Sequence, residues 1–427
     1  MINSIINKLR KKINHLLRVY FTRILVKLYK KRKFIQNEID YKDAQFAVAK
    51  KLPTKEEKEK IIERIAKKEK KIDNSIAKYK NKRDNLSKLM IKRLDEKLKE
   101  LDSQNQEEEK QIELLKSEKA KLEINSSNKE TLKRIESLNR KINKKETLIS
   151  DNKRMISIQA SRKEVEENSD IHLSLSHLTM KFGGLKAVDD LSFDVKKGEI
   201  FGLIGPNGAG KTTVFNCITQ FYKPNEGNIF FNDQNDETNS LLDFKVHEII
   251  NLGIVRTFQN VELVWELSVL DNLLVGAHSM YQSGFFSQLF HLPKLRYEEK
   301  VLKTKALDIL KELGLTQYKD LLPYGLPYGV LKKIELARTL MTKPNLIILD
   351  EPAAGLNDSE TQELGNTIKS LRDRFNLTIF LVEHDMGLVM DICDTVCAIS
   401  FGKKLAIGTP QEIQKNALVK EAYLGGE

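Results

Sequence analysis

The apolar residues of the first 33 positions recur at spacings of three and four, which places them on one face of a helix. The segment holds 11 Lys and Arg and no Asp or Glu. A basic amphipathic helix can lie in an anionic membrane interface or pack on a protein surface, and both interpretations stay open. Nucleic acid is a less favoured partner, because no recognisable nucleic-acid-binding fold accompanies the charge. The apolar face comprises Ile2, Ile5, Ile6, Leu9, Ile13, Leu16, Leu17, Tyr20, Ile24 and Leu28.

Residues 54–165 show a different helical pattern, rich in Lys, Glu, Asn and Leu and free of Pro and Gly. Pairs resembling capping boxes, Thr54 with Glu57 and Ser127 with Glu130, mark two helix starts. Polar runs at 103–106 (SQNQ) and 125–128 (NSSN) suggest breaks, so we expect two or three long helices folded back as a coiled-coil hairpin. The alternative is a solvated, partly helical linker. The positions that fit an a/d seam are Ile62, Ile65, Ile72, Ile76, Tyr79, Leu86, Met90, Ile135, Leu138, Ile142 and Ile149.

From about Ile171 the sequence pattern changes to short β-rich runs, glycines and alternating strand and helix patterns. The chain therefore divides into three predicted regions. Residues 1–50 form a basic amphipathic helical segment and residues 51–168 a coiled-coil helical extension. Residues 169–427 form an α/β domain, which carries the candidate chemistry.

Charge is distributed unevenly over the 427 residues and their formal net charge of +12. The first 170 residues contain 46 Lys and Arg against 28 Asp and Glu, whereas the remainder is mildly acidic. A basic appendage on an acidic domain points to an anionic partner, either lipid or nucleic acid. No apolar run reaches the roughly 18–20 residues of a membrane span, and the start does not resemble a signal peptide, so we expect a cytoplasmic protein.

Cysteine usage agrees with a reducing compartment. Cys217, Cys393 and Cys397 all lie in apolar runs, so we expect buried thiols. The run CDTVC has no second Cys or His pair at metal-site spacing, and zinc is not expected.

The stretch EIFGLIGPNGAGKTTVFNCI predicts a strand, a glycine-rich loop and a helix that together bind phosphate. The glycines let successive backbone N–H groups point at phosphate oxygens. Lys211 adds a positive charge for the β- and γ-phosphates, and the Thr212 hydroxyl can ligate Mg²⁺. The N-terminus of the following helix contributes its dipole. The predicted ATP-binding loop comprises Gly205, Pro206, Asn207, Gly208, Ala209, Gly210, Lys211, Thr212 and Thr213.

The run LIILDEP at 346–352 supplies a second half for such a site. Its four apolar residues predict a buried strand that ends in two carboxylates. Asp350 would hold Mg²⁺ through its water shell, and Glu351 would orient or deprotonate an attacking water molecule. Mg²⁺ and Lys211 would offset the repulsion between the two neighbouring carboxylates.

With these motifs in order, residues 171–427 resemble an ATPase subunit of ABC transporters. Phe182 in TMKFGG matches the family's aromatic residue that stacks on adenine. Gln259 in VRTFQN matches the glutamine that senses Mg²⁺ and the γ-phosphate, and AAGLND at 353–358 matches the loop that crosses the dimer interface. His384 in LVEHDM matches the switch histidine that contacts the γ-phosphate. The resemblance thus implies catalytic roles for Glu351, His384 and Gln259, with ATP and Mg²⁺ as cofactors.

Within that family the sequence resembles the ATPases of branched-chain amino acid importers. The resemblance rests on KFGGLKAVDDLSFDV, the insertion GFFSQLFHLP at 284–293, IELARTLM, DEPAAGLN and the terminal EAYLGGE. A lipid or lipopolysaccharide exporter's ATPase is the nearest alternative within the family. The first 170 residues lie outside the resemblance. They also differ from the coiled coils of DNA-repair ABC ATPases, which interrupt the ATPase domain instead of preceding it.

The resemblance implies an α/β core with a mainly parallel sheet, an antiparallel part near 172–200 and a helical subdomain around 262–340. Two such domains would pair head to tail, as a homo- or heterodimer, and integral membrane permease subunits would carry the solute. The protein would then sit peripherally at the cytoplasmic face of the membrane. Two alternatives stay open: a non-transport ABC ATPase that acts on ribosomes or nucleic acid through its basic arm, and a scaffold with inactive nucleotide machinery.

The segment LPYGVLKK at 326–333 occupies the place of the family signature LSGGQ but departs from it. Pro327 replaces the serine and can offer neither a hydroxyl nor an N–H group. It suits the start of a helix, where we expect the amides of Gly329, Val330 and Leu331 to remain free for a phosphate. Lys332 and Lys333 would add positive charge. Gly329 is therefore predicted to contact nucleotide through its backbone, and the alternative is a purely structural helix start.

Overall fold

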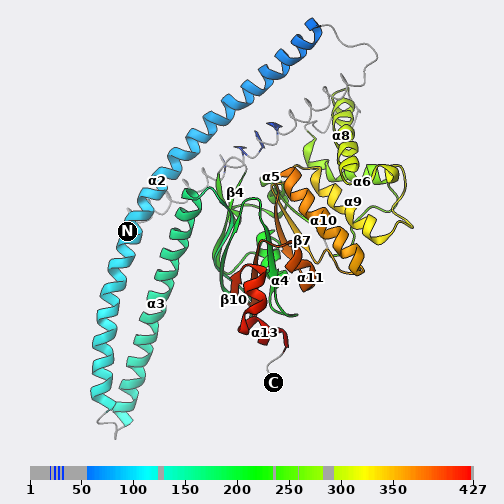
Figure 1. The fold of residues 1–427 in the computed structure, drawn as a ribbon. Coiled ribbons are helices and arrows are strands. Elements are labelled where there is room, and N and C mark those ends of the chain that lie inside the picture. The colour runs from blue at the N-terminus through cyan, green and yellow to red at the C-terminus, as the bar shows by residue number, and fades with distance from the viewer. Residues whose placement is uncertain are drawn as a thin grey trace. The chain divides into compact units, whose positions relative to one another are not determined.

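The computed structural model describes residues 20, 24–25, 27–28, 31–32, 55–123, 129–233, 237–257, 259–281 and 293–424 (Figure 1). The amphipathic helix expected over 1–33 therefore lies largely outside the described residues and stays a prediction. The predicted helix starts at Thr54 and Ser127 and most of the insertion at 284–293 lie outside them as well. Within the described part of the chain, no helix is both long enough and apolar enough to cross a membrane.

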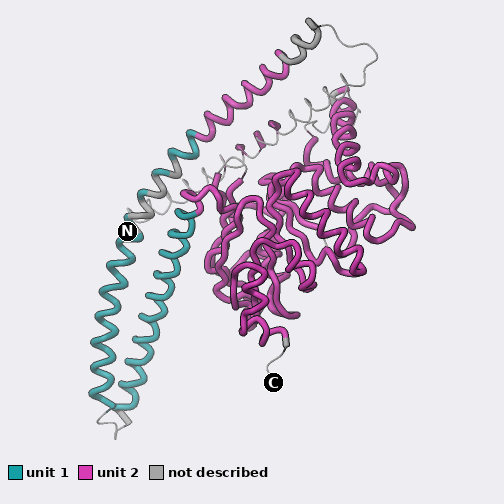
Figure 2. The backbone as a smooth tube through the Cα atoms, in the orientation of Figure 1, with its two compact units in different colours: residues 1–18, 81–164 teal, residues 19–80, 165–427 magenta. Residues whose placement is uncertain are grey.

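The described residues form two compact units (Figure 2). One unit contains the described residues of 81–164, and the other contains those of 19–80 and 165–427. This grouping cuts across the three regions expected from the sequence, whose boundaries stay a prediction. One reason for the difference is Leu25, which is fully buried in a cluster with Ile76 of the long helix α2 (Lys55–Glu123). Part of the N-terminal region thus packs on the chain itself.

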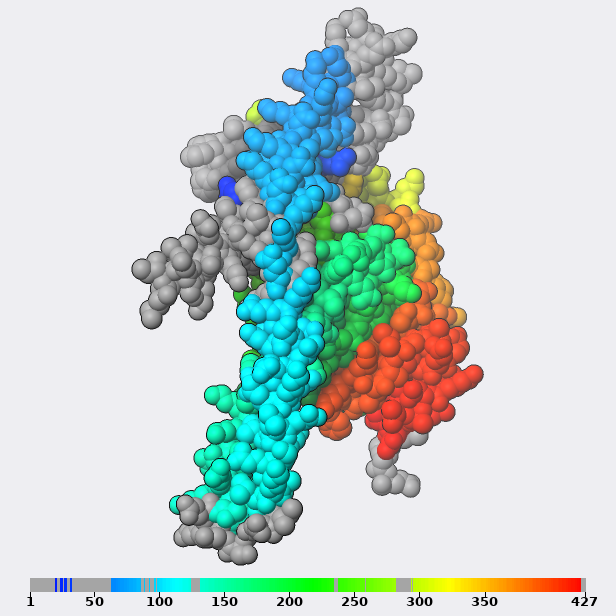
Figure 3. All heavy atoms as spheres, turned by 90° about the vertical axis from the view of Figure 1, so that its left-hand side faces the viewer, coloured from blue at the N-terminus to red at the C-terminus, as the bar shows by residue number. Residues whose placement is uncertain are grey.

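The first unit is a helical hairpin made by α2 beyond residue 80 and α3 (Lys129–Glu167). The two helices run antiparallel, because Lys116 pairs with Glu146 whereas Glu109, earlier in α2, pairs with the later Lys153. Their shared seam buries apolar residues at helical spacing, as predicted for the later part of the segment. Figure 3 draws the described atoms of α2 in blue to cyan. The buried seam includes Ile112, Leu138, Ile142 and Ile149.

The break expected at SQNQ is wrong, because α2 runs unbroken from Lys55 to Glu123. Asn105 in this run is buried, and its side-chain oxygen accepts a hydrogen bond of 2.9 Å from Asn152 Nδ2 on α3. The polar run therefore places the buried Asn105 against the half-buried Asn152 of the other helix, which satisfies part of the hydrogen-bonding capacity of Asn105 without a turn. The second expected break, at 125–128, lies outside the described residues.

The second unit contains a six-stranded sheet in the order β10-β9-β3-β8-β7-β6. All neighbouring strands pair in parallel except β10 with β9. This confirms the mainly parallel α/β core. The strands are β3 (Ile200–Ile204), β6 (Ile254–Arg256), β7 (Leu346–Asp350), β8 (Thr378–Val382), β9 (Thr395–Ser400) and β10 (Lys403–Gly408).

A separate antiparallel sheet in the order β2-β1-β4-β5 confirms the β-part expected near 172–200. It consists of β1 (Ile171–Phe182), β2 (Leu185–Lys196), β4 (Glu226–Asn232) and β5 (Thr238–Ser240). The helical subdomain expected around 262–340 is also present. It contains α6 (Val269–Gly276), α8 (Pro293–Glu312) and α9 (Tyr328–Leu340), with short 3-10 turns η2 (His278–Met280) and η3 (Thr316–Tyr318).

The remaining helices lie between or after the strands. They are α4 (Lys211–Ile218), α5 (Val246–Leu252), α10 (Asp358–Phe375), α11 (Met386–Ile392), α12 (Pro410–Lys415) and α13 (Ala417–Leu424), with the 3-10 turn η1 (Leu241–Asp243).

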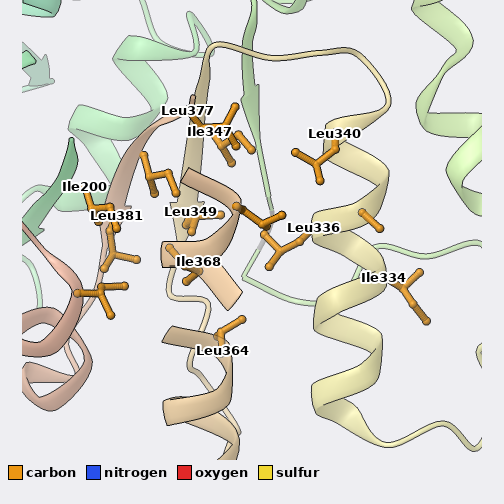
Figure 4. Packing of buried hydrophobic residues seen from close by; sticks show 14 of the residues in the cluster. Ile200, Ile334, Leu336, Leu340, Ile347, Leu349, Leu364, Ile368, Leu377 and Leu381 are labelled. Atoms are coloured by element: carbon orange, nitrogen blue, oxygen red, sulfur yellow. The ribbon is translucent and has the colours of Figure 1, made fainter. Parts of the chain in front are cut away.

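The central strands are apolar at nearly every position because both faces of the parallel sheet are covered. Along β8, Ile379 and Leu381 pack into one core cluster, whereas Phe380 and Val382 pack into the other. Figure 4 shows the first cluster, in which Leu364 and Ile368 of α10 and residues of α9 meet the strands. All three cysteines are buried in these clusters, as predicted.

This architecture gathers the site at one edge of the sheet. The parallel strands β3, β7 and β8 are neighbours, so their carboxyl ends face the same way. The phosphate loop follows β3, the two carboxylates end β7, and His384 follows β8. Ligands of open α/β sheets bind at this edge of the strands.

Candidate functional site: a nucleotide-binding and hydrolysis site

The phosphate loop runs from β3 to α4, as the sequence predicts. Gly210 is the N-cap of α4 with φ 103°, a conformation that favours glycine. A Cβ atom at this position would lie 2.4 Å from the carbonyl oxygen of Ala187. Gly208 also has a positive φ, of 79°, at an exposed position of the loop. The loop therefore depends on glycine for both its curvature and its packing. Thr212, at the start of α4, is exposed.

Lys211 is buried, and its ammonium group folds back over the loop. Nζ donates hydrogen bonds to the carbonyl oxygens of Gly205 at 2.7 Å and Pro206 at 3.2 Å. Burial lowers the pKa of Lys211, and the nearby carboxylates of Glu351 and Asp350 act in the opposite direction. The lysine thus faces the carboxylates that end β7, which is the geometry that a phosphate-binding site with a divalent cation needs.

Asp350 and Glu351 differ in their surroundings although they are adjacent. Burial, together with the negative charge of Glu351, raises the pKa of Asp350 to about 6, although Arg256 and Lys211 act in the opposite direction. Glu351 has φ 46° and donates its backbone N–H to the carbonyl oxygen of Val382 at 2.8 Å. This positive φ in a non-glycine residue lies at the point where the chain leaves β7, and such conformations are often found at functional sites.

Three predicted catalytic residues come together at one oxygen atom. Gln259 Nε2 donates a hydrogen bond of 2.6 Å to Glu351 Oε2, and His384 Nδ1 lies 3.8 Å from the same oxygen. Gln259 follows β6 and is 92 positions away from Glu351 in the sequence. The sheet thus brings a hydrogen-bond donor and an imidazole to the carboxylate that the sequence proposes as the base.

Phe182 ends β1 and is 42% exposed. Its ring makes an edge-to-face contact with Tyr222, with centroids 5.2 Å apart. Tyr222 follows α4, the helix that begins at the phosphate loop. An exposed ring held in this way can present a face to a planar base.

The signature segment begins α9 with Pro327 as its N-cap. The expectation that the amides of Val330 and Leu331 stay free is wrong, because both donate to the carbonyl oxygen of Pro327, at 3.0 and 3.1 Å. Proline lacks an N–H group, but its carbonyl accepts the first bonds of the helix. Gly329 precedes these bonds in the first turn, where helix geometry leaves N–H groups without intrahelical partners. Gly329 thus stays a candidate for backbone contact with an anion.

The side chains of Lys332 and Lys333 each have a partner within the chain. Lys332 is buried, and its Nζ donates a hydrogen bond of 2.6 Å to the backbone carbonyl of Gln259. Lys333 Nζ pairs with Glu363 Oε1 on α10 at 2.5 Å. Lys332 therefore connects the signature helix to the segment that carries Gln259.

Two further residues of the site were not found from the sequence. Arg256 ends β6, where its guanidinium lies 4.1 Å from the ring centroid of Phe221 and opposes the rise in the pKa of Asp350. Glu383 follows β8, is fully buried and accepts three backbone hydrogen bonds. The sequence does show a charged residue at the carboxyl end of a predicted strand in both cases. Such residues are common, however, and sequence spacing does not reveal whether the side chain points into the site or into solvent.

Comparison with known proteins agrees with this geometry. A model of the ABC transporter family matches residues 188–354, and a model of the branched-chain amino acid ATP-binding cassette transporter matches residues 403–427. The high-affinity branched-chain amino acid transport ATP-binding protein LivG of Escherichia coli (strain K12) is 45% identical over 253 residues. The similarity covers 59% of this chain and 97% of LivG. The corresponding BraF protein of Pseudomonas aeruginosa is 44% identical with the same coverage.

Solved structures show the same fold. A nucleotide-free ATP-binding cassette of an ABC transporter matches with a TM-score of 0.52 and 31% identity, covering 60% of this chain and 99% of that one. An ATP-binding cassette in its ADP conformation matches with a TM-score of 0.52 and 32% identity, with the same coverage. The chain therefore belongs to the ATP-binding proteins of ABC transporters, and it is an ATPase of that family whose cassette is preceded by a helical extension.

Proposed function

We propose that this chain powers the uptake of branched-chain amino acids through a separate membrane permease. The observation that carries the hydrolytic part is the meeting of Gln259 and His384 at Glu351 Oε2, beside Lys211 of the phosphate loop. The solute class rests on the names of LivG and BraF, and the direction of transport rests on the resemblance of the sequence to importer ATPases. The match at residues 403–427 favours this branch over the lipid exporters considered from the sequence.

In the proposed reaction, the phosphate loop and Lys211 bind the β- and γ-phosphates of ATP, and Phe182 stacks on adenine. Glu351 accepts the proton of the attacking water or fixes its orientation. His384 contacts the γ-phosphate, and Gln259 holds Glu351 in place through its 2.6 Å hydrogen bond. Positioning and charge stabilisation supply most of the rate in this class of phosphoryl transfer.

The carboxyl-rich edge also fits Mg²⁺. Burial is the main cause that raises the pKa of Asp350, and the charges of Glu351 and Glu383 act in the same direction, so a bound cation would favour the ionised carboxylate. Among the described residues, no cluster of three His, Cys, Asp or Glu side chains could hold a metal alone. Mg²⁺ normally takes one or two carboxylates and completes its shell with phosphate oxygens and water. Asp350, Thr212 and Gln259 are the proposed protein ligands, and the ion would neutralise charge on the phosphates.

We further propose that two ATPase subunits pair so that the first turn of α9 of each faces the phosphate loop of the other. Gly329 supports this arrangement, because an added Cβ atom would have Glu360 Oε1 as its nearest neighbour, at 3.6 Å. No described atom beyond its chain neighbours and its own helix backbone would lie closer to such a Cβ atom than an ordinary van der Waals contact, so there is steric room at Gly329. Contacts that exist only in the closed pair would let ATP shift the equilibrium between open and closed states.

The helical subdomain offers a docking surface for the permease. Several large apolar side chains are exposed there, and Trp265 packs beside Tyr324 with ring centroids 5.3 Å apart. Exposed apolar groups gathered on one subdomain commonly mark a protein interface. Docking there would place the protein at the cytoplasmic face of the membrane. The exposed residues are Val264, Val275, Leu321, Leu322 and Tyr324.

Substitution of Glu351 by Gln tests the assigned catalytic base. The amide keeps the size of the side chain but cannot accept a proton, so hydrolysis should fall by about 100-fold or more while ATP binding persists. The closed pair should accumulate with ATP, as measured by light scattering. Glu412→Gln is the matched control, because Glu412 only caps the N-terminus of α12. Wild-type turnover in Glu351→Gln would show that the assigned role is wrong.

Co-purification tests the transport assignment. The full chain should be recovered from membranes with integral membrane permease subunits, and leucine, isoleucine or valine should stimulate its ATPase activity in that complex. Recovery with ribosomal RNA instead would support the ribosome-acting alternative.

A further inference from the structure

Glu383 is a carboxylate with no exposure to solvent at the carboxyl end of β8. Its Oε1 accepts a hydrogen bond of 2.9 Å from the backbone N–H of Ala353. Its Oε2 accepts hydrogen bonds from the backbone N–H groups of His384, at 2.7 Å, and Asp385, at 3.1 Å. A buried carboxylate is costly unless hydrogen bonds compensate it, and here three do so.

These three bonds join two loops that carry the chemistry. Ala353 lies two residues after Glu351, and His384 and Asp385 begin the loop after β8. The ladder between β7 and β8 ends where Asp350 pairs with Val382. Beyond that point, Glu383 continues the connection through its side chain. The separation between Glu351 and His384 is thereby set by one carboxylate that spans both loops.

Glu383 also contacts the imidazole of the loop that it holds. His384 Nδ1 lies 3.5 Å from Glu383 Oε2 and 3.8 Å from Glu351 Oε2. Lys332 of the signature helix donates to the carbonyl of Gln259, and the side chain of Gln259 donates to the same Glu351 oxygen. Glu383 is therefore joined to the hydrolysis site through His384 and through the loop that follows Glu351.

We propose that Glu383 is a positioning residue for ATP hydrolysis: it clamps the loop after Glu351 to the loop that begins with His384, and so fixes the distance between these two groups. The proposal rests on the catalytic roles proposed above for Glu351 and His384. Glu383 does not itself contact substrate. Its loss therefore lowers the rate of the chemical step and leaves nucleotide binding intact.

The first test is Glu383→Gln in the full chain. Glutamine keeps the shape of the side chain, but its NH₂ group meets a backbone N–H on one side or the other, so one loop loses its acceptor. Misplacement of about 1 Å can cost a factor of about 100 in rate, and we expect kcat to fall by about 10- to 100-fold. The KM for ATP and the Kd of a non-hydrolysable ATP analogue should stay within about threefold, since these interactions are not made by Glu383.

Glu199→Gln is the matched control. Glu199 is also a buried carboxylate that accepts a backbone N–H, from Lys196 at 2.5 Å, and a hydroxyl, from Thr395 at 2.9 Å. It precedes β3, at the opposite end of the strand from the phosphate loop. A general loss of stability would lower kcat in both variants, whereas loss of positioning lowers it in Glu383→Gln alone. An equal fall in both variants overturns the proposal.

A double-mutant cycle distinguishes positioning from an independent effect. If Glu383 acts through His384, adding Glu383→Gln to His384→Ala should lower kcat by less than about threefold further. Full additivity of the two effects on kcat would overturn the proposal, as would wild-type kcat in Glu383→Gln.

If Glu383→Gln does not fold, Glu383→Asp is the deciding variant. It keeps the charge but is one methylene too short to span both loops, so wild-type kcat in Glu383→Asp would overturn the proposal. Failure of Glu351→Gln to block hydrolysis would be a separate result, because it would refute the catalytic base and not the clamp.

Discussion

At the scale of single residues, Glu351 could be named as a candidate from its sequence position, but its contacts could not. Its identity and its place after a buried strand are local facts, and the sequence is sufficient to nominate it. Its partners Gln259 and His384 are remote in sequence and were named through resemblance to a family. Lys332 and Glu383 were not nominated as partners of these groups, because nothing in their spacing shows that a charged side chain turns inward to bind a backbone group.

A residue outside the site, His172, gives the stability of the protein a pH dependence. It is buried in β1, with Nδ1 2.5 Å from Thr378 Oγ1, and burial with a contribution from Lys197 lowers its pKa to about 3. Its ordinary value of 6.5 applies when the chain is unfolded. Between these values the unfolded chain binds the extra proton, so the free energy of unfolding falls as the pH falls below 6.5.

From pH 7.5 to 5.5, this one group should lower the free energy of unfolding by about 1.4 kcal/mol. His172→Gln should lose that component while retaining a polar side chain beside Thr378. Urea denaturation of both proteins at the two pH values measures the difference, and substitution of the exposed His247 by Gln serves as the control. An identical pH dependence of wild type and His172→Gln would exclude His172 as its origin.

At the scale of elements, α9 begins at the place of the family signature without its usual residues. Pro327 provides the N-cap carbonyl that accepts the first bonds, and the turn begins without the serine hydroxyl of the usual signature. Lys332, four residues after Tyr328 begins the helix, holds the carbonyl of Gln259. Lys332 therefore joins α9 to Gln259, whose side chain donates a hydrogen bond to Glu351.

Gly329→Asp should prevent ATP-driven pairing of two subunits and leave ATP binding by a single subunit unchanged. The new Cβ atom has room, with Glu360 Oε1 as its nearest neighbour at 3.6 Å, so the fold should tolerate it. The carboxylate, however, would face the phosphate of the partner subunit, and like charges repel.

Gly329→Ala is the control, because it fills the same space without charge and should pair normally. Analytical ultracentrifugation with ATP in a Glu351→Gln background measures pairing. Normal pairing of Gly329→Asp would mean that α9 begins a helix and takes no part in nucleotide binding.

For the whole molecule, the two chain segments that flank residues 81–164 both belong to the ATPase unit. Lys80 pairs with Glu237 at 3.8 Å, and the carbonyl of Val165 accepts a hydrogen bond of 2.9 Å from Asn232 Nδ2. Asn232 is paired with Thr238, the residue after Glu237, so residues 80 and 165 contact the same end of the β4–β5 pair. The chain thus leaves this unit and returns to it at the same two strands.

Replacement of residues 81–164 by a short Gly-Ser linker should therefore preserve ATP hydrolysis within about twofold, because the closing distance is short and no catalytic residue is removed. A truncation at Ser169 would in addition remove Val165, which is 1% exposed, and should be less stable. Steady-state ATPase assays and thermal melts compare both variants with the full chain. Loss of hydrolysis in the linker variant, at an unchanged melting temperature, would assign the hairpin a role in the ATPase cycle.

The sequence by itself determined the features that are local along the chain. The phosphate loop, the strand that ends in Asp350 and Glu351, the helical character of α2 and α3, and the order of the segments all follow from the period of apolar residues and the chemistry of adjacent positions. In each case the residues that decide the structure are neighbours in sequence, so their pattern is sufficient.

Only the tertiary structure decided which distant groups meet. It placed Asn105 against Asn152 and so turned an expected break into a helix, and it directed Lys332 to Gln259 and Glu383 to Ala353. These contacts depend on strand order, register and helix packing, which sum many weak interactions over the whole domain. The direction of a buried polar side chain is fixed by the partner it finds there, and that partner is not encoded in its sequence neighbours.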